Sequence, residues 1–273
     1  MDNKSVTNSA WSDRQSLAKK AKEHVEKITT NEKIMKYVDE SIKSAIFYPA
    51  DSDIELKRTL KSGKINIVDA TSVEGVFIGH ELGGKTCVLN FANYVTPGGC
   101  FLDGSKAQEE FLCHGSAMYN IIASQRCLDL FYKPHIKHEN EKLFSDDILY
   151  LKEVPFFSEN IEKYPYNCLA DVIVCAAPNL RHSKASPEYV SSLLLCRIDK
   201  ILASAAINGV DNIILGAFGC GIFANNPHMV SSVFNTLLNH KYKNVFNNAI
   251  FAIPGGENFE IFKKEIPGIS KSE

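Results

Sequence analysis

Apolar segments of strand length alternate with amphipathic helices from residue 64 to residue 266, and this alternation restricts the fold more than any other feature. Strands are predicted over residues 64–70, 86–92, 146–154, 171–178, 212–219 and 244–254. Helices are predicted over residues 71–82, 105–122, 186–210, 226–240 and 257–266. The first of these helices begins with Thr71 and Glu74 at capping-box spacing. The alternation predicts a layered α/β sheet, in which ligands sit beyond the carboxyl ends of the strands.

The first 60 residues have a different pattern, with two helices followed by a polar connection. Apolar residues recur at helical spacing through residues 12–28 and 31–48. We therefore predict an N-terminal helical extension, residues 1–60, packed on a core formed by residues 61–273. Within that core, residues 125–145 are polar and basic, and we predict an exposed excursion there.

Composition excludes several classes of protein. The net charge of -2 provides no basic field for general nucleic-acid binding. There is neither an apolar run of membrane-spanning length nor an apolar signal-peptide core in the N-terminal segment, so no membrane association is expected. The eight cysteines form no CxxC pair, which favours free thiols in a reducing compartment. We expect no metal site and no cofactor, and a cytoplasmic location, or a nuclear one in a eukaryote.

The segment "LGAFGCGIFANNP" is a predicted strand followed by Gly216, Gly219 and Gly221 and then by a helix. Glycines allow a ligand to approach the backbone, and consecutive N–H groups beside a helix N-terminus attract phosphate. The segment is neither a GxGxxG fingerprint nor a phosphate loop with a lysine. A tight strand-to-helix turn is the alternative.

A second glycine loop, "TPGGC", follows the strand at residues 86–92 and leads into the helix predicted over residues 105–122. Together the two loops can grip a diphosphate, although two unrelated turns fit equally well. Ser105 and Gln108 have capping-box spacing at the start of that helix. Glu109 and Glu110 follow, and adjacent helical residues point about 100° apart, so their roles should differ. Solvated carboxylates favoured by the helix dipole are the alternative.

The segment "LNFANYVTPGGCFLDGSKAQEEFLC" resembles the signature of the microbial-type poly(ADP-ribose) glycohydrolases, in which three glycines and a spacer of six to eight residues precede Gln-Glu-Glu. Here Gly98, Gly99 and Cys100 precede a seven-residue spacer. "VIVCAAPN" and "LGAFGCGIF" resemble the family's middle strand and its second phosphate loop. The similarity runs from about residue 12 to residue 260. It implies an α/β fold of the macrodomain type, with a mixed sheet sandwiched between helices, that binds ADP-ribose.

The resemblance also implies roles for individual residues. Glu110 matches the catalytic glutamate, and Glu109 its neighbour that hydrogen-bonds the ribose. Asn93 would approach that ribose, and Phe223 would pack beside it. The other implied substrate-binding residues, mostly around the diphosphate, are Gly98, Gly99, Gln108, Gly219, Cys220, Gly221 and Ile222. By position alone, Phe259 is a candidate to stack on adenine, and a buried core aromatic is the equal alternative.

The implied activity is that of a glycosidase, a hydrolase that cleaves the O-glycosidic bond at the anomeric ribose carbon and releases ADP-ribose. The partner would be ADP-ribose or poly(ADP-ribose), free or on modified proteins. Cys100 departs from the family pattern, because the third glycine is expected there. If that position needs a positive φ, cysteine strains it, and the chain would then be a catalytically weak ADP-ribose-binding reader module. Cys100 as a nucleophile is a further, less favoured reading.

Overall fold

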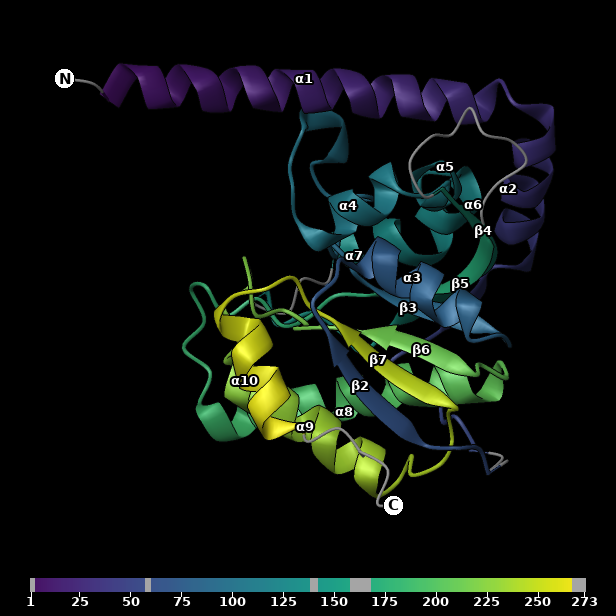
Figure 1. The fold of residues 1–273 in the computed structure, drawn as a ribbon, viewed down its shortest axis with the longest axis vertical. Coiled ribbons are helices and arrows are strands. Elements are labelled where there is room, and N and C mark those ends of the chain that lie inside the picture. Colours follow the sequence, from purple (N-terminus) through teal and green to yellow (C-terminus); the bar gives the residue numbers. More distant parts are fainter. Residues whose placement is uncertain (1–2, 57–59, 138–141, 158–167, 267–273) are drawn as a thin grey trace.

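The computed structural model describes residues 3–56, 60–137, 142–157 and 168–266, and it contains a seven-stranded mixed sheet between two layers of helices (Figure 1). The strand order is β1-β4-β5-β3-β6-β7-β2. The parallel strands are β2 (Lys64–Val68), β3 (Thr86–Phe91), β5 (Cys168–Cys175), β6 (Asn212–Leu215) and β7 (Asn248–Ala252). β4 (Ile148–Phe156) pairs antiparallel with β5, which makes the sheet mixed, as predicted.

The continuous apolar runs in the sequence form the centre of this sheet because both of its faces are covered. One face packs against α8 (Pro187–Ile207), α9 (Pro227–Asn239) and α10 (Glu257–Glu265). The other face packs against α3 (Ser72–Glu81), α4 (Gln108–His114) and α5 (Met118–Ile122). Figure 1 shows the first group below the sheet and the second above it. The predicted capping box is confirmed. The Thr71 hydroxyl accepts a hydrogen bond from the backbone N–H of Glu74, and the Glu74 carboxylate accepts a hydrogen bond from the backbone N–H of Thr71.

The N-terminal segment forms two helices, α1 (Asn3–Thr29) and α2 (Glu32–Ser44), and then a strand that the sequence did not predict. The expected helix over residues 31–48 is wrong at its end, because residues 46–48 form β1 (Ile46–Tyr48), antiparallel to β4 at the sheet edge. Ile46 and Tyr48 pack on one core cluster and Phe47 on the other, which is the alternation of a strand. The predicted division at residue 60 stays a prediction, although residues before it contribute to the sheet.

The prediction of an exposed excursion over residues 125–145 is wrong for most of its described part. Residues 125–136 form α6 (Gln125–Cys127), a π-helical turn η2 (Leu128–Tyr132) and α7 (Lys133–Ile136). Four side chains of this segment are buried: Cys127, Phe131, Tyr132 and His135. They recur at helical spacing between charged residues, so the average polarity of the segment hid an apolar stripe. Residues 138–141 of the excursion lie outside the described residues.

The helix predicted over residues 105–122 is two helices, α4 and α5. The helical conformation is interrupted at Gly115, where the Cβ of any other residue would come within 2.6 Å of Val73 Cγ2. The next residue, Ser116, forms an isolated β-bridge with Phe156.

The eight cysteines are free thiols, as predicted. Within the described ranges, no helix has the length and apolar character needed to cross a membrane.

Candidate functional site

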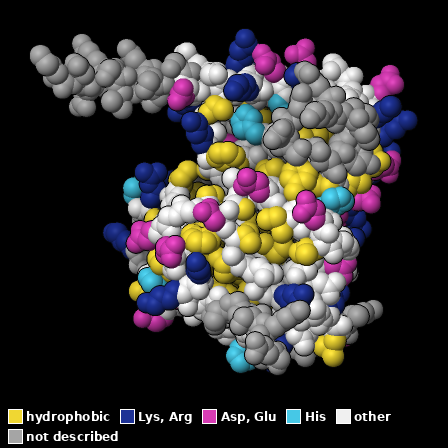
Figure 2. Space-filling model, in the orientation of Figure 1, with side chains coloured by type: hydrophobic (Ala, Val, Ile, Leu, Met, Phe, Trp, Pro, Cys, Tyr) yellow, Lys and Arg dark blue, Asp and Glu magenta, His cyan; other side chains and the backbone are white. Residues whose placement is uncertain are grey.

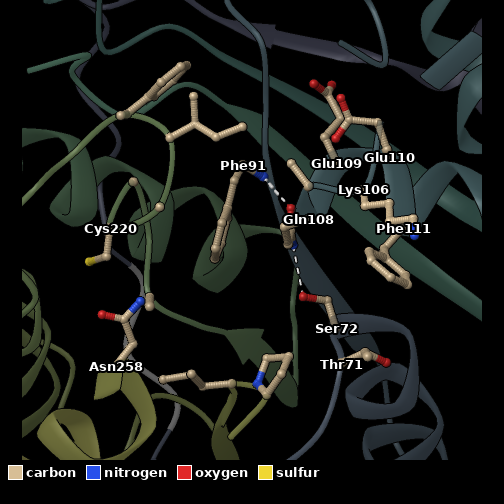
Figure 3. Close-up of a pocket in the computed structure, with 18 of the residues that line it drawn as sticks. Thr71, Ser72, Phe91, Lys106, Gln108, Glu109, Glu110, Phe111, Cys220 and Asn258 are labelled. Carbon is tan, nitrogen blue, oxygen red and sulfur yellow. Dashed lines mark hydrogen bonds between the residues drawn. The ribbon is translucent and has the colours of Figure 1, made fainter. Parts of the chain in front are cut away.

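A cavity of about 1090 Å³ opens at the carboxyl ends of β3, β6 and β7 (Figure 3). It is lined by the two glycine loops, by the start of α4 and by the loop that joins β7 to α10. The sequence analysis predicted a ligand site at this edge of the sheet, and the cavity lies there. Nearly all the predicted site residues line it: Asn93, Gly99, Gln108, Glu109, Glu110, Gly219, Cys220, Gly221, Ile222 and Phe223.

Glu109 lies in the cavity wall with only 3% of its surface exposed, and three N–H donors hold its carboxylate. Oε1 accepts hydrogen bonds from Asn90 Nδ2 at 3.1 Å and from the Gly98 N–H at 3.2 Å. Oε2 accepts one from the Asn93 N–H at 2.7 Å. Since three of the about four hydrogen-bonding positions of a carboxyl group are taken by N–H donors, one position on Oε2 is left to hydrogen-bond a ligand hydroxyl.

Glu110 is equally buried, with 5% of its surface exposed, but it is held at one oxygen only. Its Oε1 accepts a hydrogen bond from the Cys100 N–H at 3.0 Å. Its Oε2 has no hydrogen-bond partner among the described residues. A buried carboxyl oxygen without a partner is costly, so this oxygen has a hydrogen-bonding position left for a ligand. The alternative of two solvated first-turn carboxylates is therefore wrong.

Gly99 lies between the two carboxyl groups. Its φ is +56°, and a Cβ at this position would come within 2.7 Å of Glu110 Oε1 and 3.2 Å of Glu109 Oε2. The N–H groups on either side of it, those of Gly98 and Cys100, donate to the same two carboxylates. The first glycine loop therefore shapes and holds the glutamate pair. The implied diphosphate contact at Gly98 and Gly99 stays a prediction, and the Gly98 N–H already has a protein acceptor.

Cys100 does not strain the loop. Its φ is -103° and its side chain is exposed at the cavity. A negative φ does not require glycine. The concern that cysteine strains the position is therefore wrong.

Gln108 anchors α4 to the sheet. Its Oε1 accepts a hydrogen bond from the Phe91 N–H at 2.8 Å, and its Nε2 donates to Leu89 O and to Ser72 Oγ (Figure 3). The predicted capping box is wrong, because Ala107 is the N-cap and no side chain caps the helix. Gln108 lines the cavity, but its side-chain amide already uses both N–H donors and one acceptor position of the oxygen in these hydrogen bonds within the protein.

The second glycine loop is closed by Gly219 and Asn225. Gly219 has a φ of +73°, and a Cβ there would come within 2.5 Å of Asn225 Nδ2. Gly221 has no such restriction, because its φ lies outside the positive region and a Cβ would meet open space. The α9 N-terminus is capped by the Asn226 side chain, so it does not add to an anion site as the sequence suggested.

Three consecutive backbone N–H groups of this loop have no acceptor in the described part of the chain. Among the described residues, none accepts a hydrogen bond from the N–H of Gly221, Ile222 or Phe223. These three residues also line the cavity. Consecutive unpaired N–H groups form a concavity that suits an anionic group such as a phosphate.

The two aromatic candidates differ. Phe223 lines the cavity, and its ring centroid lies 5.8 Å from that of Phe144. Phe259 does not line the cavity but packs on the core, with Lys263 Nζ 5.6 Å from its ring centroid. The core alternative is therefore favoured for Phe259. At that end the cavity is lined instead by Glu257 and Asn258, which the sequence analysis missed.

Asn90 is a further residue that the sequence analysis missed. It is fully buried in β3, and its amide donates to Glu109 Oε1, while its own Oδ1 has no partner among the described residues. A single polar residue inside the apolar run "TCVLNFA" was the signal, since a buried amide needs a partner.

We expect Asn90→Leu to weaken ADP-ribose binding about tenfold without lowering Tm. The substitution keeps the volume but removes the donor that holds Glu109 Oε1 in place for a ligand. The lost hydrogen bond to a carboxylate contributes about 1.5–3 kcal/mol to stability, and loss of the buried Oδ1, which has no partner among the described residues, offsets this. Calorimetry and thermal unfolding give both readouts. Asn248→Leu is the matched control, because Asn248 is also buried but bonds Asn212 on a neighbouring strand. It should lower Tm and leave affinity intact, and unchanged affinity in Asn90→Leu would refute the role.

Burial raises the pKa of Glu109 from its ordinary value of 4.5 to about 8, and the N–H donors of Asn93, Asn90 and Gly98 oppose this rise. Because the folded pKa lies above the unfolded one, the folded protein holds this proton more tightly. The stabilisation is complete below about pH 4.5 and is lost as the pH rises towards 8. We expect Glu109→Gln, which cannot titrate, to gain stability relative to the unsubstituted protein over this range, on the order of a few kcal/mol. Thermal unfolding of both proteins from pH 4.5 to 8 measures it, and parallel curves would contradict it.

The described residues contain no group of three His, Cys, Asp or Glu side chains that could hold a metal ion. The cavity is lined by carboxyl groups, loop N–H groups and aromatic side chains. This set suits an uncharged sugar flanked by an anionic group.

Known structures have the same fold. The poly(ADP-ribose) glycohydrolase of Thermomonospora curvata bound to the inhibitor ADP-HPD is 26% identical, with a TM-score of 0.80, covering 92% of this chain and 99% of that one. A second structure of the Thermomonospora curvata enzyme has the same identity and TM-score. The Deinococcus radiodurans enzyme in complex with ADP-ribose is 24% identical, with a TM-score of 0.75, covering 84% of this chain and 96% of that one. No curated protein sequence matches this chain.

The family model of the microbial-type PARG catalytic domain matches residues 15–159, more than half of the chain. The matched range contains the first glycine loop, both glutamates and the strand with Asn90. The chain therefore belongs to the microbial-type poly(ADP-ribose) glycohydrolase family.

Proposed function

We propose that this protein is a glycosidase that hydrolyses the O-glycosidic bond at the anomeric ribose carbon of poly(ADP-ribose) and releases ADP-ribose. The observation that carries the proposal is the buried Glu110 carboxyl in the cavity wall, which is held at Oε1 by the Cys100 N–H and has no partner at Oε2 among the described residues. Family membership and the similarity to the Thermomonospora curvata enzyme, which was solved with an inhibitor bound, support it.

In the proposed mechanism, Glu110 serves both halves of the reaction. The protonated carboxyl gives its proton to the leaving oxygen, and the bond from that oxygen to the anomeric carbon breaks with its electron pair on the oxygen. An oxocarbenium-like ribose remains. Water attacks the anomeric carbon, and the Glu110 carboxylate takes a proton from that water, which restores the acid. One carboxyl thus does what two do in most glycosidases.

The neighbouring groups orient the substrate. The remaining position on Glu109 Oε2 forms a hydrogen bond with a ribose hydroxyl, and Asn93 lies beside it in the cavity wall. The diphosphate lies on the N–H groups of Gly221, Ile222 and Phe223, where its negative charge finds donors. That charge then stands close to the ribose and stabilises the positive charge that develops there.

Release of ADP-ribose from poly(ADP-ribose) and from mono-ADP-ribosylated protein by the purified protein tests the proposal. We expect release from the polymer. Binding of ADP-ribose without release from either substrate would instead identify a reader module. Absence of both binding and release would reject the cavity as an ADP-ribose site.

A further inference from the structure

Phe111 is a large hydrophobic side chain exposed at the mouth of the cavity. It follows Glu110 directly in α4, and 46% of its surface is exposed. Figure 2 shows hydrophobic side chains across the middle of this face of the molecule, so exposure alone is not informative. The position is informative, because most large exposed hydrophobic residues of the described chain, such as Leu82 and Ile136, do not line the cavity. Phe111 and Ile222 do.

The two sides of the cavity face different parts of a substrate. Figure 3 shows Lys106 and Phe111 on the same side as Glu110, with Cys220 and Asn258 across from them. In the proposed reaction the released ADP-ribose lies toward the loop of Gly221 and Phe223. The group that departs is bonded to the oxygen that Glu110 protonates. It therefore extends along the α4 wall, which Lys106 and Phe111 line.

The chemistry of this wall distinguishes the possible leaving groups. In poly(ADP-ribose) the departing oxygen belongs to the ribose of the next adenosine, so an adenine and then a diphosphate lie close to it. An aromatic ring stacks on any base, and an ammonium group pairs with phosphate. On a mono-ADP-ribosylated protein, the departing group is an amino-acid side chain with neither feature.

We propose that Phe111 and Lys106 form a leaving-group subsite that binds the adenosine and the phosphate of the next ADP-ribose unit. The inference rests on the proposed function, because a leaving group lies along this wall only if the glycosidic bond is cleaved at Glu110. Phe111 stacks on the adenine, and Lys106 neutralises phosphate charge.

The test compares Phe111→Ala with the unsubstituted protein. Removal of base stacking, worth about 1–3 kcal/mol per base, should lower kcat/KM on poly(ADP-ribose) by roughly 5- to 160-fold. ADP-ribose has no leaving group, so its Kd in calorimetry should change less than about twofold, and thermal unfolding checks the fold. Leu82→Ala is the matched control, because Leu82 is also exposed but lies outside the cavity. It should change neither quantity.

Lys106→Gln gives an independent readout. We expect a raised KM for the polymer at low ionic strength and a smaller difference at high salt, since an exposed ion pair is screened. Lys22→Gln on α1, at an exposed position outside the cavity, should have no such effect.

The outcomes separate the subsite from the activity. If the unsubstituted protein cleaves the polymer and Phe111→Ala cleaves it equally well, the subsite is rejected and the activity stands. If the unsubstituted protein cleaves only mono-ADP-ribosylated protein, no adenosine lies along this wall and the subsite is rejected. If it cleaves neither, the proposed function fails first and the subsite fails with it.

Discussion

Glu110→Gln is expected to lower the rate of ADP-ribose release from poly(ADP-ribose) by about 10²–10⁴-fold, the usual contribution of a general acid or base. The amide keeps the size of the side chain and can still accept the hydrogen bond that Glu110 Oε1 receives from the Cys100 N–H. It cannot give a proton to the leaving oxygen or take one from water. The affinity for ADP-ribose should stay within a few-fold, because the proposed diphosphate contacts are on the other glycine loop.

Rate measurements with saturating polymer and calorimetry with ADP-ribose check both halves of this expectation. Glu109→Gln is the natural comparison, since Glu109 is the adjacent buried carboxyl and its proposed role is to hold the ribose. It should lower affinity as well as rate. A Glu110→Gln protein that turns over at the unsubstituted rate would remove Glu110 from the chemistry.

Gly99→Ala is expected to cause a loss of activity of a similar size without removing a catalytic group. The added methyl would come within 2.7 Å of Glu110 Oε1, and the φ of +56° disfavours a side chain. The loop and the carboxyl must therefore move apart. A displacement of about 1 Å in a reacting group can cost about 10²-fold in rate.

The matched control for Gly99→Ala is Gly83→Ala. Gly83 also has a positive φ, +74°, but a Cβ there meets no atom within 4 Å, and the residue lies outside the cavity. Both variants should lose some stability from backbone strain, and thermal unfolding measures that loss. Only Gly99→Ala should lose activity. Equal activity in the two variants would mean that the glutamate pair does not depend on the space beside Gly99.

Much of the fold could be predicted from the sequence because the central strands are buried on both faces and are therefore continuous apolar runs. The capping box of Thr71 and Glu74 marked the start of α3 for a local reason. The edge strand β1 could not be found in this way, because three residues after a helix carry little pattern of their own and pairing with β4 forms the strand. The buried stripe from Cys127 to His135 was obscured by the charged residues between its members.

Some residues of the site were predicted from the sequence and others were not, for a similar reason. The glutamate pair and both glycine loops are local motifs, and they meet at one cavity. Contacts between distant segments were not predictable. Asn90 reaches Glu109 across the β3–α4 connection, and Gln108 bonds to Ser72 on α3 instead of capping its own helix. The backbone conformation at Cys100 also depends on the folded loop, so the sequence suggested strain where the structure has none.

A crystal structure of the Glu110→Gln variant with a short poly(ADP-ribose) chain bound tests the central claim most directly, because the variant should hold its substrate without cleaving it. We predict the scissile oxygen within hydrogen-bond distance, about 2.6–3.2 Å, of the side-chain amide at position 110. The diphosphate of the unit to be released should lie on the N–H groups of Gly221, Ile222 and Phe223. A ribose bound away from the two glutamates, or a polymer bound outside the cavity, would contradict the account.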